Sequence, residues 1–372
     1  MIMDKIKKII SKGYLINKEE ASCVEYISQH DGGVRWGDKK SIENISSNLF
    51  KNCFCFILPT YVGSNEPNKQ VEQMIHIFDR VNEVAENFDH VPIILFIAFQ
   101  FTEGHSEVAK KIMEQFFKQQ KQCRSNLKLI GFINKGSRKK INLNIAISFV
   151  QNFNLSGIGW VDDDVYLEPK CLVYLVEKFI KMPSPCAVGA KKIAASYTGW
   201  HSRVLKKIKL LTQPAMNYPH GCCILVSPEV IIKGIPNRYC SEDGYICFEL
   251  ISPNEKDPFY RLCIVPESIC HHYVGAKTLK ETLQKIRRLL LNHIIFMADY
   301  PKEVSIYYFQ FSLFYGLWPL SPWSTKLSLT KRLLAWPIKM IHFSWFVITG
   351  LEVIIRAMIN RPVSINWRQR EL

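Results

Sequence analysis

Residues 156–169 read SGIGWVDDDVYLEP, an apolar run that ends in three consecutive aspartates. Residues 157–161 have the length and composition of a buried β-strand, and Pro169 suits the first turn of a following helix. Three adjacent carboxylates repel one another, and each favours water or a counter-charge. The stretch therefore predicts a strand that leads either into a solvated acidic turn or into a site for a cation.

The sequence before this stretch alternates between strand-like and helix-like segments. The strand candidates are residues 53–59, 91–99 and 126–133. Segments with apolar residues at helical spacing follow them, at residues 71–88, 106–120 and 139–150. This alternation is typical of an α/β domain with a mostly parallel sheet and helices on both faces. In such sheets ligands bind at the carboxyl ends of the strands, and the three aspartates lie at one such end.

The alternation loosens after residue 190. The sequence predicts a strand at residues 220–226, a helix with acidic residues at its start at 241–251, and a strand at 259–268. Residues 270–276 are expected to form a loop, and residues 278–300 a basic amphipathic helix. We therefore divide the chain into a peripheral N-terminal extension (1–50), an α/β domain (51–275) and a helical, aromatic-rich C-terminal region (276–372).

Composition and charge narrow the class of protein. Of the 372 residues 48% are hydrophobic and 22% charged, which excludes a disordered chain. A net charge of +15 favours nucleic acid, an anionic membrane or phosphorylated substrates as partners. No nucleic-acid-binding motif accompanies the charge, so we expect an enzyme that handles phosphates or faces a membrane, and no nucleic acid. Twelve cysteines without a C-x-x-C pair predict reduced thiols in a cytosolic compartment.

Two apolar stretches near the C-terminus suggest contact with a membrane. Residues 304–325 carry no charge but contain Pro319 and Pro322, and residues 341–359 contain Glu352 and Arg356. Aromatic-rich apolar segments with basic flanks are typical of interfacial or re-entrant attachment. The alternative is the core of a helical domain. We expect a protein at the cytoplasmic face of a membrane.

The acidic turn and a later acidic pair could carry chemistry. Asp162 and Asp164 can direct two carboxylates at one divalent cation, which would neutralise the charge of a departing diphosphate. A solvated turn that caps the next helix explains them equally well. Asp243, which follows Glu242 at a predicted helix start, could take a proton from an attacking hydroxyl. Helix capping is the alternative there.

Two further groups of residues have the composition of ligand sites. A basic loop before the predicted helix at 139–150 suits diphosphate oxygens, and it contains Lys135, Arg138, Lys139 and Lys140. His271 and His272 could complete a metal site or contact phosphate. The alternatives are an ordinary charged loop and structural histidines.

Taken together, these pieces resemble the family-2 inverting glycosyltransferases, which have the GT-A fold. The matching segments occur in the family's order, and they read FILPTY, GSRKKINLNIAI, GWVDDDVYLEPKCL, CAVGAKKI, HGCCILVSPEVIIKGI and SEDGYICFEL. The resemblance covers about residues 53–275. It implies that residues 51–275 form a GT-A catalytic domain, a Rossmann-like sheet flanked by helices.

The resemblance also implies roles for individual residues. Residues expected to bind the nucleotide-sugar donor are Pro59, Thr60, Tyr61, Gln100, Lys139, Asp162 and Asp163. Residues expected to hold a divalent metal (Mn²⁺ or Mg²⁺) are Asp164, Asp162 and His272. Asp243 would be the general base, supported by Glu242. The base would deprotonate an acceptor hydroxyl, which attacks the anomeric carbon and inverts its configuration.

Two departures from the family pattern bear on substrate. Gln100 lies where many relatives carry an aspartate that reads uracil, so the base of the donor stays open, with a UDP-sugar as the expectation. Processive relatives carry Q-x-x-R-W after the acidic pair, whereas this chain keeps Gln284 and Arg287 but has Arg288 in place of the tryptophan. The HHYVGAKT loop looks like the histidine loop of non-processive relatives. Trp200, Gln284 and Arg287 are candidates for contact with the acceptor.

We therefore expect a non-processive enzyme that transfers one sugar to a hydroxyl of a glycan or a lipid-linked acceptor, in the synthesis of cell-surface polysaccharide or glycoconjugate. The alternatives are a processive polysaccharide synthase, a catalytically idle binding module of the same fold, and a nucleotidyltransferase. The last would need a glycine- and arginine-rich signature near the first strand, which GSNEPNK does not supply.

Overall fold

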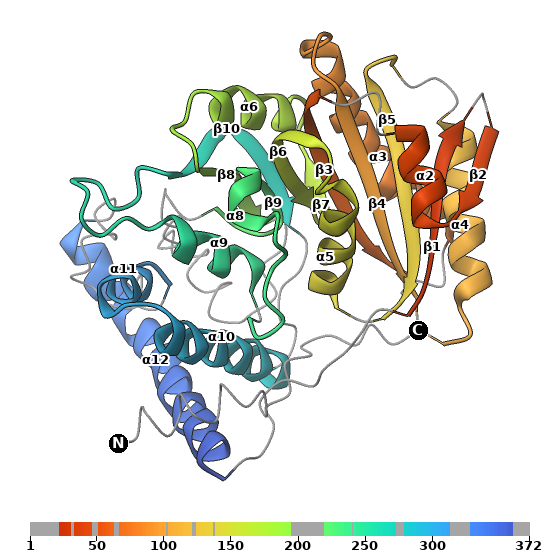
Figure 1. Cartoon of the computed structure of the whole chain (residues 1–372). Coiled ribbons are helices and arrows are strands. Elements are labelled where there is room, and N and C mark those ends of the chain that lie inside the picture. The colour runs from red at the N-terminus through yellow and green to blue at the C-terminus, as the bar shows by residue number, and fades with distance from the viewer. Residues whose placement is uncertain are drawn as a thin grey trace.

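The fold is described from a computed structural model of the chain. The structure describes residues 22–30, 33–46, 51–62, 67–101, 103–120, 124–136, 138–194, 219–239, 241–272, 279–312 and 328–359. It is a mixed α/β fold in which a large, mostly parallel sheet is flanked by helices (Figure 1). The α/β architecture expected from the sequence is thus confirmed.

Ten strands of the described residues form one sheet in the order β2-β1-β5-β4-β3-β6-β9-β8-β10-β7. In chain order they are β1 (Ser22–His30), β2 (Gly33–Gly37), β3 (Lys51–Tyr61), β4 (Ile93–Phe101), β5 (Leu127–Lys135), β6 (Asn154–Val161), β7 (Val165–Leu167), β8 (Ala187–Ala194), β9 (Cys223–Val226) and β10 (Leu262–His272). Strands β1, β9 and β7 run opposite to the others. The central strands β5, β4, β3 and β6 are parallel, so their carboxyl ends share one edge.

The helices cover both faces of the sheet (Figure 1). The helices of the described residues are α2 (Lys39–Ser46), α3 (Pro67–Asn87), α4 (Ser106–Gln119), α5 (Lys139–Val150), α6 (Cys171–Ile180), α8 (Pro228–Ile231), α9 (Glu242–Leu250), α10 (Leu279–Asp299), α11 (Lys302–Ser312) and α12 (Leu329–Met358). One core cluster joins the sheet to α3, α4 and α6, and the other joins it to α5, α9 and α10.

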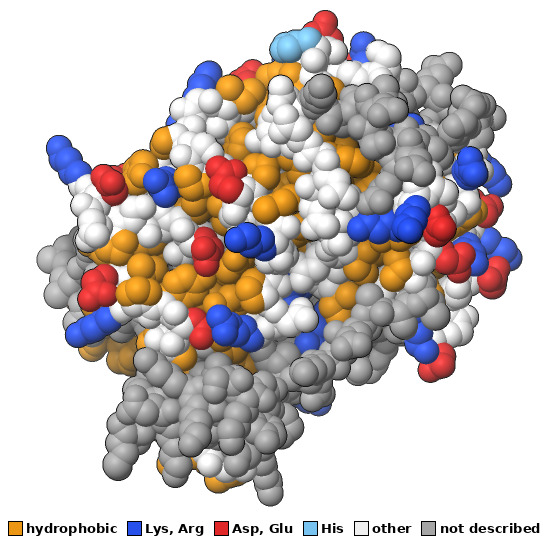
Figure 2. All heavy atoms as spheres, in the orientation of Figure 1, with side chains coloured by type: hydrophobic (Ala, Val, Ile, Leu, Met, Phe, Trp, Pro, Cys, Tyr) orange, Lys and Arg blue, Asp and Glu red, His pale blue; other side chains and the backbone are white. Residues whose placement is uncertain are grey.

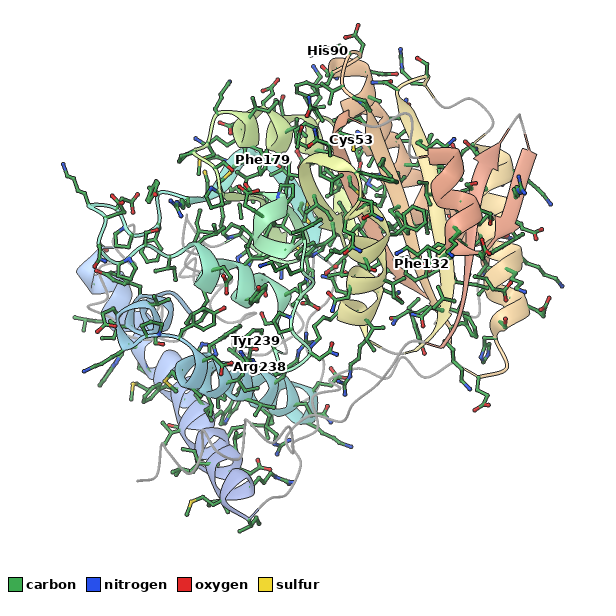
Figure 3. The ribbon with its side chains drawn as sticks, in the orientation of Figure 1. Cys53, His90, Phe132, Phe179, Arg238 and Tyr239 are labelled. Atoms are coloured by element: carbon green, nitrogen blue, oxygen red, sulfur yellow. The ribbon has the colours of Figure 1, made fainter. Side chains whose placement is uncertain are left out.

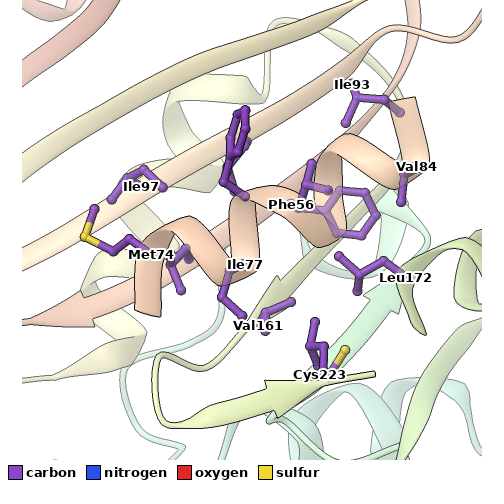
Figure 4. Packing of buried hydrophobic residues seen from close by; sticks show 14 of the residues in the cluster. Phe56, Met74, Ile77, Val84, Ile93, Ile97, Val161, Leu172 and Cys223 are labelled. Carbon is purple, nitrogen blue, oxygen red and sulfur yellow. The ribbon is translucent and has the colours of Figure 1, made fainter. Parts of the chain in front are cut away.

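The alternation of side chains along each strand produces these two clusters. In β3, Cys53, Cys55 and Ile57 belong to the cluster with α5, whereas Phe54, Phe56 and Leu58 belong to the cluster with α3. Successive side chains of a strand point to opposite faces, so a strand covered on both faces is apolar throughout. Figure 4 shows Met74 and Ile77 of α3 beside residues of the sheet in the cluster with α3. This is why the predicted strands were continuous apolar runs.

The N-terminal part of the chain differs from the expectation. Residues 1–50 are predicted to be peripheral, but residues 22–46 add β1, β2 and α2 to the sheet. Strand β1 pairs with β5 through Ile27 and Gly131, and Ile27 is fully buried. The strand lies in a mostly polar sequence, so its apolar residues give little signal of their own. Residues 1–21 lie outside the described residues.

The two histidines also differ from the expectation. His271 and His272 are the last residues of β10 and not part of a loop. They pair with Tyr166 and Val165 of β7 on one side, and with β8 on the other. The pairing of β10 with β8 shifts in register between Val265 and Ile269, next to Pro266. This irregularity interrupts the strand, so the sequence indicated a strand only before it and a loop after it. Neither β7 nor β8 was predicted.

The C-terminal helices pack onto the sheet layer through aromatic side chains. Phe248 of α9 stacks on Phe296 of α10 at 4.4 Å between ring centroids, and Tyr239 stacks on the same ring at 4.6 Å. Arg238, labelled with Tyr239 in Figure 3, pairs with Asp299 at 2.9 Å. Among the described residues, no helix is both long and apolar enough to cross a bilayer. Residues 313–325 of the first predicted apolar stretch lie outside them.

Candidate active site

Three segments far apart in the sequence meet beyond the carboxyl end of β6. The first is the acidic turn at residues 162–164, directly after β6. The second precedes β9, and its Cys222 carbonyl accepts a hydrogen bond of 2.9 Å from the Asp162 backbone. The third is the start of α9, where the Asp243 carboxylate accepts a hydrogen bond of 3.1 Å from the Gly221 N–H. The acidic turn and the acidic pair expected from the sequence therefore lie on one site.

Lys139, the first residue of α5, ties these segments together. Its ammonium lies 2.5 Å from an Asp162 carboxylate oxygen and donates to the Gly221 carbonyl at 2.7 Å. The Trp160 indole N–H donates to the same carbonyl at 2.7 Å, and the ammonium lies 5.6 Å from the Trp160 ring. The backbone of Gly221 thus binds Lys139 through its C=O and Asp243 through its N–H.

Asp243 is held in the form that a general base requires. Its two carboxylate oxygens accept hydrogen bonds from the Ser241 hydroxyl, from the Gly244 N–H at 2.9 Å and from the Gly221 N–H at 3.1 Å. Burial favours the neutral acid, but the Ser241 bond, the electrostatic effect of His220 and the Gly221 bond outweigh it. The pKa of Asp243 is therefore lowered, and the carboxylate is ionised at neutral pH.

Asp162 has the opposite tendency. Burial raises its pKa to about 7, Lys139 opposes that rise, and the neighbouring carboxylates of Asp164 and Glu242 add to it. Burial also disfavours the charge of Lys139, but Asp162, Glu242 and Asp243 outweigh burial and raise the lysine pKa. The site therefore concentrates negative charge around one ammonium.

This charge distribution fits a divalent cation. Carboxylate oxygens are the ligands that Mg²⁺ and Mn²⁺ prefer, and a cation would relieve the repulsion between Asp162 and Asp164. Within the described residues, no group of three or more His, Cys, Asp or Glu side chains is arranged to hold a metal. Asp162 and Asp164 would supply two carboxylate ligands to such a cation.

Asp163, the middle aspartate, turns to the neighbouring strand instead. Its carboxylate accepts hydrogen bonds from the Thr60 hydroxyl at 2.8 Å and the Tyr61 N–H at 3.3 Å. The Gln70 amide of α3 donates to the Thr60 hydroxyl at 2.5 Å and lies 3.4 Å from the same carboxylate oxygen. Asp163 therefore fastens the acidic turn to the end of β3. This explains the third aspartate, which the sequence could not.

The residues expected to surround the base of the donor are neighbours. Pro59, Thr60 and Tyr61 end β3, and Tyr61 pairs with Gln100 of β4 in the parallel register. The Gln100 amide donates to the backbone carbonyl of Arg138 at 2.8 Å and is buried. Its side chain thus links the end of β4 to the residue that precedes α5.

The basic loop is not a single anion site. Lys135 pairs with Glu103 at 3.2 Å. The Lys140 ammonium is buried and donates to the backbone carbonyls of Pro236, Asn237 and Tyr239 at 2.5–3.3 Å. Of the lysines expected to contact diphosphate oxygens, only Lys139 lies at the acidic turn, because helix geometry directs successive residues to different sides.

The histidines and the acceptor candidates have their own partners. His271 contacts Glu168 at 2.7 Å, and His272 pairs in register with Val165, which directly follows Asp164. Arg287 forms an ion pair with Glu352 of α12 at 2.8 Å and so joins α10 to α12. Gln284 lies one turn earlier on α10, and Trp200 lies outside the described residues.

Sequence reasoning missed the residues that organise the carboxylates. Gly221 binds both halves of the site, Ser241 caps α9 by accepting from the Gly244 N–H at 3.1 Å, and His220 acts on Asp243 electrostatically. The available signals were a His-Gly pair before a strand and a serine before an acidic helix start, a typical N-cap pattern.

Comparisons with known proteins give structural matches only. No protein-family model matches the chain, and no curated protein matches it. One similar solved structure is "Mannosyltransferase PcManGT from Pyrobaculum calidifontis in complex with GDP-Man and Mn2+", with a TM-score of 0.47 and 14% identity over 83% of this chain and 87% of that chain. Another, "Crystal Structure of a Mycobacterial Protein", has a TM-score of 0.39 and 11% identity over 72% and 82% of the two chains.

Proposed function

We propose that the protein is a glycosyltransferase that moves a single sugar from a nucleotide-sugar donor to an acceptor hydroxyl with inversion. One observation carries the proposal: an ionised Asp243 and a turn bearing Asp162 and Asp164 are joined through the backbone of Gly221 and the Lys139 ammonium. A base close to a turn that can bind a diphosphate is what a single displacement at an anomeric carbon requires.

In this mechanism Asp243 accepts the proton of the acceptor hydroxyl. The hydrogen bonds from Ser241, Gly221 and Gly244 hold its carboxylate in place, so little reorganisation is needed when the hydroxyl approaches. The deprotonated oxygen attacks the anomeric carbon as the bond to the diphosphate breaks. No covalent enzyme intermediate forms, and the configuration inverts.

A divalent cation held by Asp162 and Asp164 would neutralise the charge of the leaving diphosphate. Lys139, which contacts Asp162, adds positive charge on the same side. The ends of β3 and β4, with Tyr61 beside Gln100, would receive the nucleotide base. We infer a UDP-sugar as donor and a glycan or lipid-linked molecule as acceptor. We also propose His272, which pairs in register with the residue after Asp164, as a further ligand of the metal.

The test is release of nucleoside diphosphate from a panel of nucleotide sugars with Mn²⁺ or Mg²⁺. Asp243→Asn should lower turnover by at least about 100-fold, the contribution of a general base, and should still bind donor. Asp164→Asn should lose metal-dependent donor binding. Asp89→Asn is the matched control, because the Asp89 side chain is 90% exposed on the surface. Wild-type turnover by Asp243→Asn would refute the assignment of the base.

A further inference from the structure

Helix α12 presents an apolar face to solvent. The exposed residues of this face are Leu333, Leu334, Trp336, Ile341, Val347, Ile348, Leu351, Ile355, Met358 and, just after the helix, Ile359. Their exposed fractions run from 40% to 65%. We call these residues the outer face of α12. A soluble helix places polar residues there, and a contiguous exposed apolar patch marks an interaction site.

The outer face is continuous along the helix. At 3.6 residues per turn these positions fall within roughly 160° of the circumference. The 30 residues of α12 extend about 45 Å at the usual rise per residue. No Lys, Arg or Asp lies within that arc, and the one acidic residue at its border is Glu352.

The acidic residue at this border is paired with two arginines. Glu352 accepts hydrogen bonds from Arg287 of α10 at 2.8 Å and from Arg356 at 2.9 Å. The two ion pairs lower the pKa of Glu352 against the opposing effect of burial. Thr349 and Val353 are buried on the side of α12 opposite the outer face. The ion pairs thus fix which side of α12 faces α10 and which faces outward.

We propose that α12 lies flat on a lipid bilayer, with its outer face among the acyl chains and head groups. A single long helix with an uncharged aliphatic face matches a lipid surface, because lipid needs no shape-complementary groove. Figure 1 draws α12 along the lower left margin of the molecule, away from β1–β5. The sequence of α12 adds Lys331, Arg332 and Lys339, and the chain carries a net charge of +15, which favours anionic head groups.

Other exposed apolar surface lies over the C-terminal part of the chain. Ile306 of α11 is 45% exposed, and Figure 2 shows hydrophobic side chains gathered on the left of the visible face, where Figure 1 draws α9, α10 and α11. Tryptophan is enriched at membrane interfaces, and Trp336 lies within the outer face. The proposal adds a lipid bilayer to the partners of the protein, and it uses none of the residues that the proposed sugar transfer depends on.

Flotation of the full chain with vesicles of phosphatidylcholine and phosphatidylglycerol tests it. We expect the wild type to float. The double variant Ile348→Glu, Leu351→Glu should lose at least about tenfold in vesicle-bound fraction, because two charges would enter the apolar layer. Ile180→Glu is the matched control, since Ile180 is 57% exposed on α6, and it should float like the wild type.

Circular dichroism and the urea midpoint of the double variant show that it is folded, and light scattering gives its oligomeric state. A wild type that stays in the dense fraction, or a folded double variant that floats like the wild type, would overturn the proposal. A wild-type dimer that the substitutions dissociate, without vesicle binding, would assign the outer face to a second copy instead. None of these readouts depends on sugar transfer, so failure of the proposed reaction is recognised separately.

Discussion

Replacing Thr60 by valine removes the hydroxyl that contacts Asp163 of the acidic turn and keeps the shape of the side chain. The Thr60 hydroxyl donates to Asp163 at 2.8 Å and accepts from the Gln70 amide at 2.5 Å. Thr60 is 3% exposed and Gln70 is 8% exposed, so water cannot easily replace either bond. The substitution therefore tests whether Asp163 fastens the turn to β3.

The cost follows from those two bonds. A hydrogen bond to a carboxylate contributes about 1.5–3 kcal/mol, and a buried amide left without its acceptor adds about 1–3 kcal/mol. Gln70 can still approach Asp163, 3.4 Å away, which limits the second contribution. We expect Thr60→Val to lower the free energy of unfolding by about 2–4 kcal/mol.

Urea denaturation followed by circular dichroism measures this change. Thr60→Ser is the control, since it keeps the hydroxyl and loses one methyl group, at a cost of about 1 kcal/mol. Isothermal titration with Mn²⁺ gives a second readout, because a loosened turn should weaken binding by Asp162 and Asp164 about tenfold in the valine variant. A valine variant within about 0.5 kcal/mol of the wild type would show that the Thr60–Asp163 contact does not hold the turn.

Two further predictions concern the base and the sheet. The hydrogen bond from Ser241 lowers the pKa of Asp243, so the carboxylate persists to a lower pH than that of an ordinary aspartate and is lost as the pH falls through the lowered pKa. Ser241→Ala removes this bond and should therefore move the acid limb of the pH–kcat/KM profile to higher pH. Ser241→Thr should restore the limb, and an unmoved limb in the alanine variant would contradict the role of Ser241. Gly159→Ala would place a β-carbon 2.3 Å from the Ile224 carbonyl oxygen and should lower the urea midpoint by the equivalent of about 3 kcal/mol. Gly350→Ala is the control, because its β-carbon would lie 3.7 Å from the nearest atom, and it should leave the urea midpoint unchanged or raise it. Equal midpoints for the two variants would mean that β9 does not pack against Gly159 as described.

Local sequence patterns predicted the centre of the fold. Strands buried on both faces are apolar throughout, and helices packed on one face carry apolar residues about every 3.6 positions. Each of the strands β3 to β6 and each helix between them can therefore be predicted from its own segment of sequence. The same reasoning placed the acidic turn at the carboxyl end of a strand. It did not find β1, because five of the nine residues of this strand are polar and its apolar residues form no continuous run.

The sequence by itself determined that the chain is basic and that carboxylates and lysines occur directly after buried strands. Only the tertiary structure decided which of them meet. Asp162 and Asp243 are brought together by Gly221, a residue with no side chain, and adjacent lysines separate because Lys140 turns to backbone carbonyls while Lys139 reaches Asp162. Such contacts depend on the pairing of β6 with β9 and on the direction of each side chain, neither of which leaves a periodic signal in the sequence.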